Sequence, residues 1–128
     1  YRYAQKELRE WNPDLIVPVP VHRSKERMRG FNQAAYLAEK LSCYTGIMTD
    51  TNLVRKVIKT KSQKKLNALQ RRKNLEKAFA VSEDVRGKDI LVIDDVYTTG
   101  STIDAMASCL KKKGAENVYF LTVCIGRT

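Results

Sequence analysis

The strongest structural constraint in this sequence is a strand–helix–strand pattern in its C-terminal third. Four consecutive aliphatic residues, Ile90 to Ile93, lie within a predicted strand over 89–96 and favour burial of both of its faces. A glycine-containing turn follows, then a predicted helix over 101–113 and a predicted strand over 118–125. Parallel strands joined by a helix form right-handed crossovers in nearly all proteins. The pattern therefore predicts a doubly wound α/β sheet.

The predicted helix over 101–113 carries its own boundary signals. Its last turn contains three lysines, Lys111 to Lys113, where the helix dipole favours positive charge. Gly114 then suits the left-handed conformation that commonly ends a helix. Apolar residues repeat at helical spacing and mark the face expected to pack on the sheet: Ile103, Met106, Ala107 and Leu110.

The other predicted elements complete one domain covering all 128 residues. They are a short helix over 3–11, strands over 15–19, 51–58 and 78–82, and an amphipathic helix over 28–43 that ends near Gly46. We therefore expect a mainly parallel sheet of about five strands with flanking helices. No apolar stretch approaches the roughly 18 to 20 residues that a membrane-spanning helix needs.

Three cysteines, Cys43, Cys109 and Cys124, are far apart and form no C-x-x-C pair. An odd number of dispersed cysteines fits a reducing cytoplasm, and each is expected to pack as a small apolar residue rather than serve in a zinc site or as a catalytic thiol. His22 is the only histidine, which excludes mechanisms that require two imidazoles. The sequence starts at Tyr1 without a basic and apolar leader, so we expect no export signal and a chain that begins partway into a longer product.

The net charge of +10 is concentrated in one segment. Between Arg55 and Lys77 the sequence has ten basic residues and a single acidic one, Glu76. Such a segment can be a solvated helix face, but a local excess of this size repels itself unless an anion binds. A polyanionic partner is therefore expected.

Acidic and hydroxyl side chains follow the most apolar strand. Asp94 and Asp95 end that strand, and a turn rich in threonine and serine leads into the next helix. Ligands of open α/β sheets bind beyond the carboxyl ends of the strands. Amides, hydroxyls and the positive helix end can hold a phosphate there, and the carboxylates can bind sugar hydroxyls or a magnesium ion beside it. The pattern predicts a ribose 5-phosphate site; a capped turn with two surface aspartates is the alternative.

Residues 93–102 closely resemble the phosphoribosyl pyrophosphate motif of type I phosphoribosyltransferases. The resemblance implies that Asp94 and Asp95 are the catalytic acidic pair and contact the 2- and 3-hydroxyls of the ribose. It also implies that the turn binds the 5-phosphate through Val96, Tyr97, Thr98, Thr99, Gly100, Ser101 and Thr102. Many purine salvage enzymes of this superfamily carry an aspartate where this chain has Thr98, so classical purine salvage is disfavoured.

The N-terminal half is similar to ComF-type competence proteins, a branch of that superfamily. The similar stretches are residues 17–23 and 27–33, with Gln63, Leu66, Arg71, Asn74 and Phe79 fitting the same branch. The loop after the first predicted strand has rigid prolines and several arginines, which suit a pyrophosphate; a solvated basic loop is the alternative. The substrate-binding residues expected there are Pro20, His22, Arg23 and Arg29.

The same resemblance implies that residues 59–77 form a flexible basic flap that closes over the bound substrate. Closure would exclude water and bring positive charge to the departing pyrophosphate. Leu66, Leu69 and Leu75 could instead pack this segment permanently as a helix. The sequence leaves both alternatives open.

The resemblance implies a domain that binds phosphoribosyl pyrophosphate with Mg²⁺, in a protein of DNA uptake and natural transformation. The ion would be chelated between the pyrophosphate and the ribose hydroxyls, without a metal site built from the protein alone. Catalysis of phosphoribosyl transfer and the identity of the acceptor are left undecided. The alternatives are a non-catalytic factor that binds single-stranded DNA through the basic segment, and a metabolite-sensing domain. Other competence-machinery proteins are further expected partners.

Overall fold

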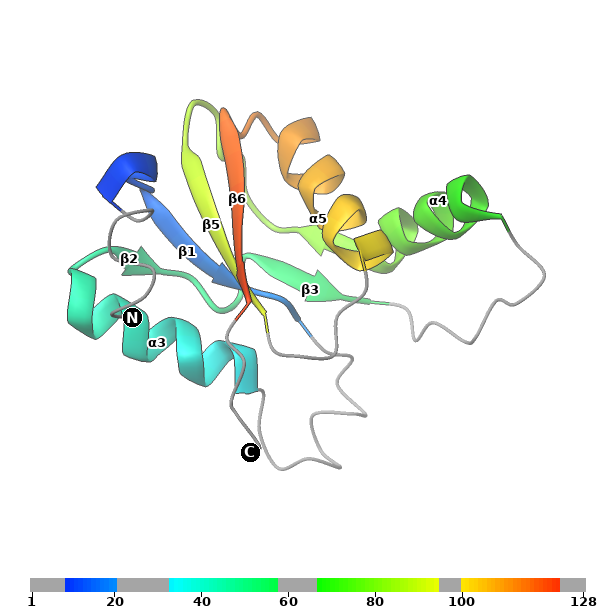
Figure 1. Ribbon diagram of the computed structural model, residues 1–128. Helices are drawn as coiled ribbons and strands as arrows, with labels where there is room; N and C mark the ends of the chain where they lie inside the picture. Colours follow the sequence, from blue (N-terminus) through cyan, green and yellow to red (C-terminus); the bar gives the residue numbers. More distant parts are fainter. Residues whose placement is uncertain (1–8, 21–32, 58–66, 95–99, 123–128) are drawn as a thin grey trace.

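The computed structural model describes residues 9–20, 33–57, 67–94 and 100–122. Its central sheet has four parallel strands in the order β2–β1–β5–β6. The strands of this sheet are β1 (Leu15–Pro18), β2 (Met48–Thr49), β5 (Asp89–Asp94) and β6 (Asn117–Thr122). The helices that pack on it are α3 (Gln33–Thr45) and α5 (Gly100–Lys112). The predicted class, a mainly parallel α/β sheet with flanking helices, is confirmed (Figure 1).

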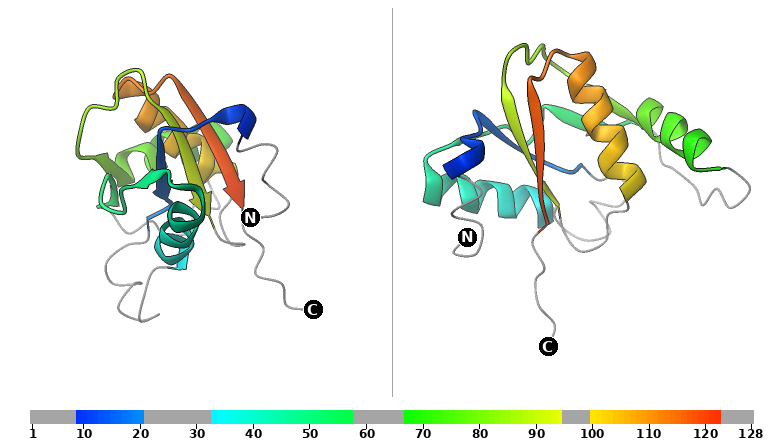
Figure 2. Two further views of the ribbon diagram at one scale, coloured as in Figure 1. Left: turned by 90° about the vertical axis from the view of Figure 1, so that its left-hand side faces the viewer. Right: turned by 45° about the horizontal axis from the view of Figure 1, so that its top comes forward.

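Helices α3 and α5 cover opposite faces of the sheet, as Figures 1 and 2 show. Successive side chains of a strand point to opposite faces, so the aliphatic runs of β1 and β5 divide between two apolar clusters. The cluster beneath α3 contains Ile16, Leu91 and Ile93 together with Ala38 and Leu41. The cluster beneath α5 contains Leu15, Val17, Ile90 and Val92 together with Ala105, Met106 and Leu110. Burial of both faces explains why these strands lack polar alternation.

Strand β5 lies between β1 and β6 and pairs with both in parallel. Polar contacts fix the register at its amino end. The backbone N–H of Asp89 donates to the Asp14 carboxylate (2.8 Å), and the Asn117 side-chain amide donates to the Asp89 carboxylate (3.0 Å). Because the three strands start in register, their carboxyl ends also lie side by side.

Helix boundaries agree with the predicted signals. Helix α3 ends at Thr45 and is followed by Gly46 with a positive φ of 76°, and α5 is followed after Lys113 by Gly114 with a φ of 99°. The predicted strand–helix–strand unit is thereby confirmed as β5, α5 and β6. Of the predicted N-terminal helix, residues 9–11 are helical, and Trp11 stacks on Tyr119 of β6 with ring centroids 4.9 Å apart.

Two predicted strands do not join the main sheet. β3 (Val54–Lys56) and β4 (Phe79–Val81) instead pair with each other in antiparallel orientation. The fourth strand of the sheet is β2, which the sequence did not predict because two residues, one of them the 73% exposed Met48, carry no periodic signal. Within the described ranges, the expected sheet of about five strands is therefore a four-stranded sheet with a separate pair.

Helix α4 (Ala68–Ala78) occupies the C-terminal part of the basic segment. It begins with a capping box: the Asn67 side chain accepts from the Gln70 backbone N–H (2.8 Å), and the Gln70 side chain accepts from the Asn67 N–H (3.1 Å). The helix packs against α5. Residues 68–77 are therefore helical, as the helical alternative expected, but Leu69 is 52% exposed and does not provide the packing expected of it. Residues 59–66 of the predicted flap, including Leu66, lie outside the described ranges. Among the helices described, none is long and apolar enough to cross a membrane.

Two glycines after helices provide a matched stability test. A Cβ at Gly114 would lie 2.8 Å from the Arg86 Cα, whereas a Cβ at Gly46 would meet nothing within 4 Å. We expect Gly46→Ala to lower the free energy of unfolding by about 1 kcal/mol through left-handed strain alone, and Gly114→Ala by about 2 to 4 kcal/mol because the backbone must also shift. Urea denaturation measures both, and equal losses would contradict the close approach to Arg86.

Candidate functional site

The carboxyl ends of β1 and β5 form one edge of the sheet. Pro18 is the register partner of Ile93, and the backbone N–H of Val19 donates to the Ile93 carbonyl oxygen (2.8 Å). Half-buried Pro20 follows directly. At the end of β6, Thr122 is the register partner of Asp94. Three strand ends therefore converge where ligands bind in open α/β sheets.

Asp94 is the last residue of β5 and is 3% exposed. It is the only residue among the buried ones described that carries a charged side chain. The alternative of two surface aspartates is thus wrong for Asp94. A buried carboxylate is costly unless hydrogen-bond donors or a cation surround it, so its position at a strand end favours a role in binding.

The amino end of α5 lies next to this carboxylate along the chain, with five residues between Asp94 and Gly100. Gly100 and Ser101 form the first turn of the helix, and Thr102 follows with a partly exposed side chain. The first N–H groups of a helix have no partner within it, and the helix dipole is positive there. The end of β5 and the start of α5 therefore place a carboxylate and an anion-binding helix end at one edge (Figure 1).

The structure places part of the predicted site. The predicted residues that it describes are Pro20, Asp94, Gly100, Ser101 and Thr102. Those that lie outside the described ranges are Asp95, Val96, Tyr97, Thr98, Thr99, His22, Arg23 and Arg29. Asp94 ends β5, Pro20 comes two residues after the neighbouring strand β1, and the other three begin α5, so two chain segments far apart in sequence meet at this edge.

The donor set at this edge fits a magnesium ion held largely by its ligand. A carboxylate oxygen is a preferred ligand of Mg²⁺, and the buried Asp94 side chain supplies one. Within the described parts of the chain, no three histidine, cysteine or acidic side chains gather as a metal cluster. Mg²⁺ usually keeps several waters and substrate phosphates as ligands, so one or two carboxylates suffice.

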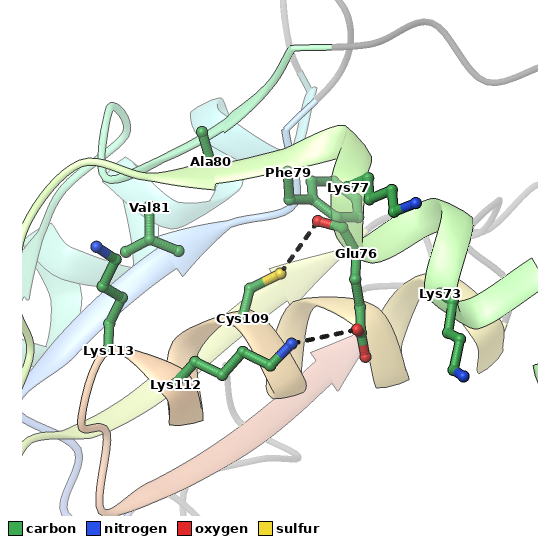
Figure 3. Close-up of a pocket in the computed structure, with 9 residues that line it drawn as sticks. All are labelled: Lys73, Glu76, Lys77, Phe79, Ala80, Val81, Cys109, Lys112 and Lys113. Atoms are coloured by element: carbon green, nitrogen blue, oxygen red, sulfur yellow. Dashed lines mark hydrogen bonds and ion pairs between the residues drawn. The ribbon is translucent and has the colours of Figure 1, made fainter.

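The structure also contains a pocket that the sequence did not predict. Helix α4, strand β4, helix α5 and the adjoining Lys113 line an open pocket of roughly 560 Å³, shown in Figure 3. Its rim carries four lysines: Lys73, Lys77, Lys112 and Lys113. The pocket depends on contacts such as that of Lys112 with Glu76, which are 36 residues apart, and no local motif encodes it. The only sequence signal was the pair Lys73 and Lys77, one helical turn apart.

The two described cysteines differ in environment. Cys109 is half-buried in that pocket, and its thiol donates to the backbone carbonyl oxygen of Glu76 (3.5 Å). Burial raises the pKa of the Cys109 thiol, and the Glu76 charge adds to this rise while Lys112 opposes it. A raised pKa disfavours the thiolate nucleophile, in agreement with a structural role. Cys43, by contrast, is exposed on α3, so the expected burial is wrong for that residue.

Comparison with known families agrees with this geometry. Residues 1–128 match the family model of the phosphoribosyl transferase domain. The chain belongs to this family. The predicted membership in the phosphoribosyltransferase superfamily is therefore confirmed. The matched residues include the three strands whose carboxyl ends converge.

Sequence relatives of this phosphoribosyl transferase domain confirm the ComF-type resemblance. The chain is 37% identical over 112 residues to DNA utilization protein YhgH of Salmonella typhi, a match covering 88% of this chain and 49% of that protein. It is 36% identical over 109 residues to competence protein F of Haemophilus influenzae, covering 83% and 48%. Competence protein ComFC of Bacillus subtilis is 32% identical over 102 residues, covering 78% and 39%. The chain thus spans about half the length of these relatives or less.

A solved structure shares the fold of this domain. The purine phosphoribosyltransferase from Pyrococcus horikoshii Ot3 superposes with a TM-score of 0.60 at 18% sequence identity, covering 95% of this chain and 68% of that one. At this identity the likeness shows the fold alone. The type I phosphoribosyltransferase-like architecture is therefore confirmed.

Alkylation rates test the two cysteine environments. At pH 8 we expect iodoacetamide to modify Cys43 several-fold faster than Cys109, because burial shields the Cys109 thiol and its raised pKa lowers the thiolate fraction. Peptide mass spectrometry after quenching measures both rates, and equal rates at pH 8 would contradict the described environment of Cys109.

Proposed function

We propose that this domain binds phosphoribosyl pyrophosphate with Mg²⁺ at the carboxyl edge of its sheet and serves a protein of DNA uptake. The observation that carries this proposal is the buried Asp94 carboxylate at the end of β5, with five residues between it and the amino end of α5. Family membership supports the substrate class, and the names of the relatives support the DNA-related context. Cytoplasmic location belongs to the same proposal.

Each part of the edge has a proposed task. Asp94 accepts hydrogen bonds from the ribose hydroxyls, and Asp95 is proposed to share this task. The first amides of α5 and the preceding turn donate to the 5-phosphate, where the dipole favours negative charge. Bound Mg²⁺ would neutralise charge on the pyrophosphate oxygens. The ligand is thereby oriented with its pyrophosphate toward the segment that follows β1, where Arg23 and Arg29 are proposed to bind it.

If the domain is catalytic, it transfers the phosphoribosyl group. The bond between the ribose C1 and a pyrophosphate oxygen breaks, the pyrophosphate leaves with the electron pair, and a bond forms between C1 and an acceptor nucleophile. Positive charge develops at C1 and negative charge on the leaving pyrophosphate. Groups already oriented toward these charges contribute most of the rate, because they need no rearrangement during the reaction.

Calorimetry with phosphoribosyl pyrophosphate and Mg²⁺ tests the binding site. We expect the double variant Asp94→Asn with Asp95→Asn to weaken binding by about tenfold or more, because a hydrogen bond to a charged group contributes about 1.5 to 3 kcal/mol. The control is Asp104→Asn, an exposed acidic residue of α5, which should bind as the unaltered protein does. Circular dichroism verifies that each variant is folded. Absence of binding heat in the unaltered protein would refute the proposal.

A pyrophosphate-release assay decides whether binding leads to chemistry. Incubation with phosphoribosyl pyrophosphate, Mg²⁺ and a mixture of nucleobases should release pyrophosphate if one of the bases is an acceptor. If calorimetry shows binding of phosphoribosyl pyrophosphate but this mixture releases no pyrophosphate, the metabolite-sensing alternative is favoured, in which the ligand is bound and no bond is broken.

Single-stranded DNA binding is a second candidate function. The described cations of the basic segment favour it: Arg55 on β3 and Lys73 and Lys77 on α4 are all exposed. Lysine and arginine bind nucleic-acid backbones by neutralising phosphates and releasing counterions. The segment from Arg55 to Lys77 contains no aromatic residue, so base stacking there would be absent and sequence preference slight. Competence-machinery proteins remain proposed partners of the same protein.

Filter binding at several salt concentrations tests this second candidate. The logarithm of the association constant should fall linearly with the logarithm of salt concentration, with a slope near −0.7 for each phosphate contacted. Arg55→Gln with Lys77→Gln should make the slope shallower by about 1.4, whereas the control pair Lys40→Gln with Lys88→Gln should leave it unchanged. An association constant that does not change with salt concentration would exclude a phosphate-backbone interaction.

A further inference from the structure

The pocket between α4, β4 and α5 is separate from the proposed substrate site. Its lysines at positions 112 and 113 lie at and beyond the end of α5, whereas the carboxyl edge of the sheet lies at the start of that helix, at Gly100. At a rise of 1.5 Å per residue, the twelve steps from Gly100 to Lys112 span roughly 18 Å. One small ligand therefore cannot occupy both places.

The pocket combines an apolar floor with a cationic rim. Figure 3 shows Lys73 and Lys77 on α4 and Lys112 and Lys113 at the end of α5, with the floor residues between them. The floor consists of Phe79, Val81 and Cys109. Among the described residues of the lining, Glu76 is the only acidic one, and it is already paired with Lys112 (3.4 Å). The lining thus retains a net positive charge that a bound anion would neutralise.

The floor is held in place by contacts between the two helices. The Glu76 carboxylate, whose side chain is 18% exposed, pairs with Lys112, and the Glu76 backbone carbonyl oxygen accepts from the Cys109 thiol. Phe79 is 6% exposed and Val81 packs against the cluster beneath α5. The apolar surface is consequently preformed, and the flexible lysine side chains can adjust to an anion above it.

We propose that this pocket binds an organic phosphate, a compound in which a phosphate or pyrophosphate is attached to an apolar or aromatic body. Lysine ammonium groups act as point charges toward phosphate oxygens, and the floor accepts the body of the ligand. A volume of roughly 560 Å³ lies in the range of sites that enclose one small molecule. Ligand contacts on both helices would hold α4 against α5, so binding also stabilises their packing.

Calorimetry with ADP in the absence of Mg²⁺ tests the proposal. The unaltered protein should bind ADP, and Lys73→Gln with Lys113→Gln should weaken binding by about tenfold or more. Neither residue takes part in the Glu76 contacts that join the helices. The control pair Lys40→Gln with Lys88→Gln removes the same charge outside the pocket and should change the affinity less than twofold. Equal weakening by both pairs would overturn the proposal, because it would show a general charge effect.

Cysteine footprinting locates the ligand within the molecule. Saturating ADP should slow iodoacetamide modification of Cys109 by at least threefold and leave exposed Cys43 unchanged. Absence of protection at Cys109, or equal protection of both thiols, would overturn the proposal. Protection by a thymidine oligonucleotide but not by ADP would also overturn it, in favour of a polymeric ligand.

Two further measurements separate this site from its alternatives. Inorganic pyrophosphate should bind at least several-fold more weakly than ADP. Equal affinity would show that the apolar floor does not contribute to binding, and would overturn the proposal. Asp94→Asn should leave ADP binding and Cys109 protection unchanged, since the two places are separate. Loss of ADP binding in that variant would assign ADP to the carboxyl edge of the sheet and contradict a second site.

Discussion

The pairing of β5 with β1 on one side and β6 on the other is the interaction on which the rest of the structure depends. The four central aliphatic residues of β5, Ile90 to Ile93, are 0% exposed because two strands and two helices surround them. The polar contacts of Asp89 set the register at one end, and that register carries Asp94 to the other end. A slip of one residue would exchange the two faces of the strand and move the Asp94 side chain to the opposite face of the sheet.

Helix α5 connects the two features of chemical interest. Its amino end follows the buried Asp94 after five residues and offers backbone amides, while its carboxyl end carries Lys112 and is followed by Lys113, two of the four lysines of the α4–α5 pocket. The dipole favours an anion at the first end and lysines at the second, so both arrangements also stabilise the helix. The same helix packs on the sheet through Met106 and Leu110, so its two ends remain available for charged groups.

Prediction succeeded where a segment's environment is uniform along its length. Strand β5 and helix α5 are flanked by capping and turn residues, and their apolar residues follow a single period, so their bounds were predicted within a few residues. β3 and β4 were predicted as strands, but their pairing with each other was not predicted, since a short strand does not encode which strand it will pair with. The residues of α4 are polar on most sides, and its packing on α5 through Glu76 and Cys109 has no periodic signature.

The sequence by itself determined the α/β class, the strand–helix–strand unit and the acidic and hydroxyl residues at its first turn, because these are local patterns of apolar period, glycine and side-chain chemistry. Tertiary structure alone decided that Asp94 is buried, that β1, which precedes Pro20, pairs with the strand that ends at Asp94, and that lysines from two distant segments line one pocket. Burial and proximity depend on which distant segments pack together, and that outcome is a property of the whole chain rather than of any window within it.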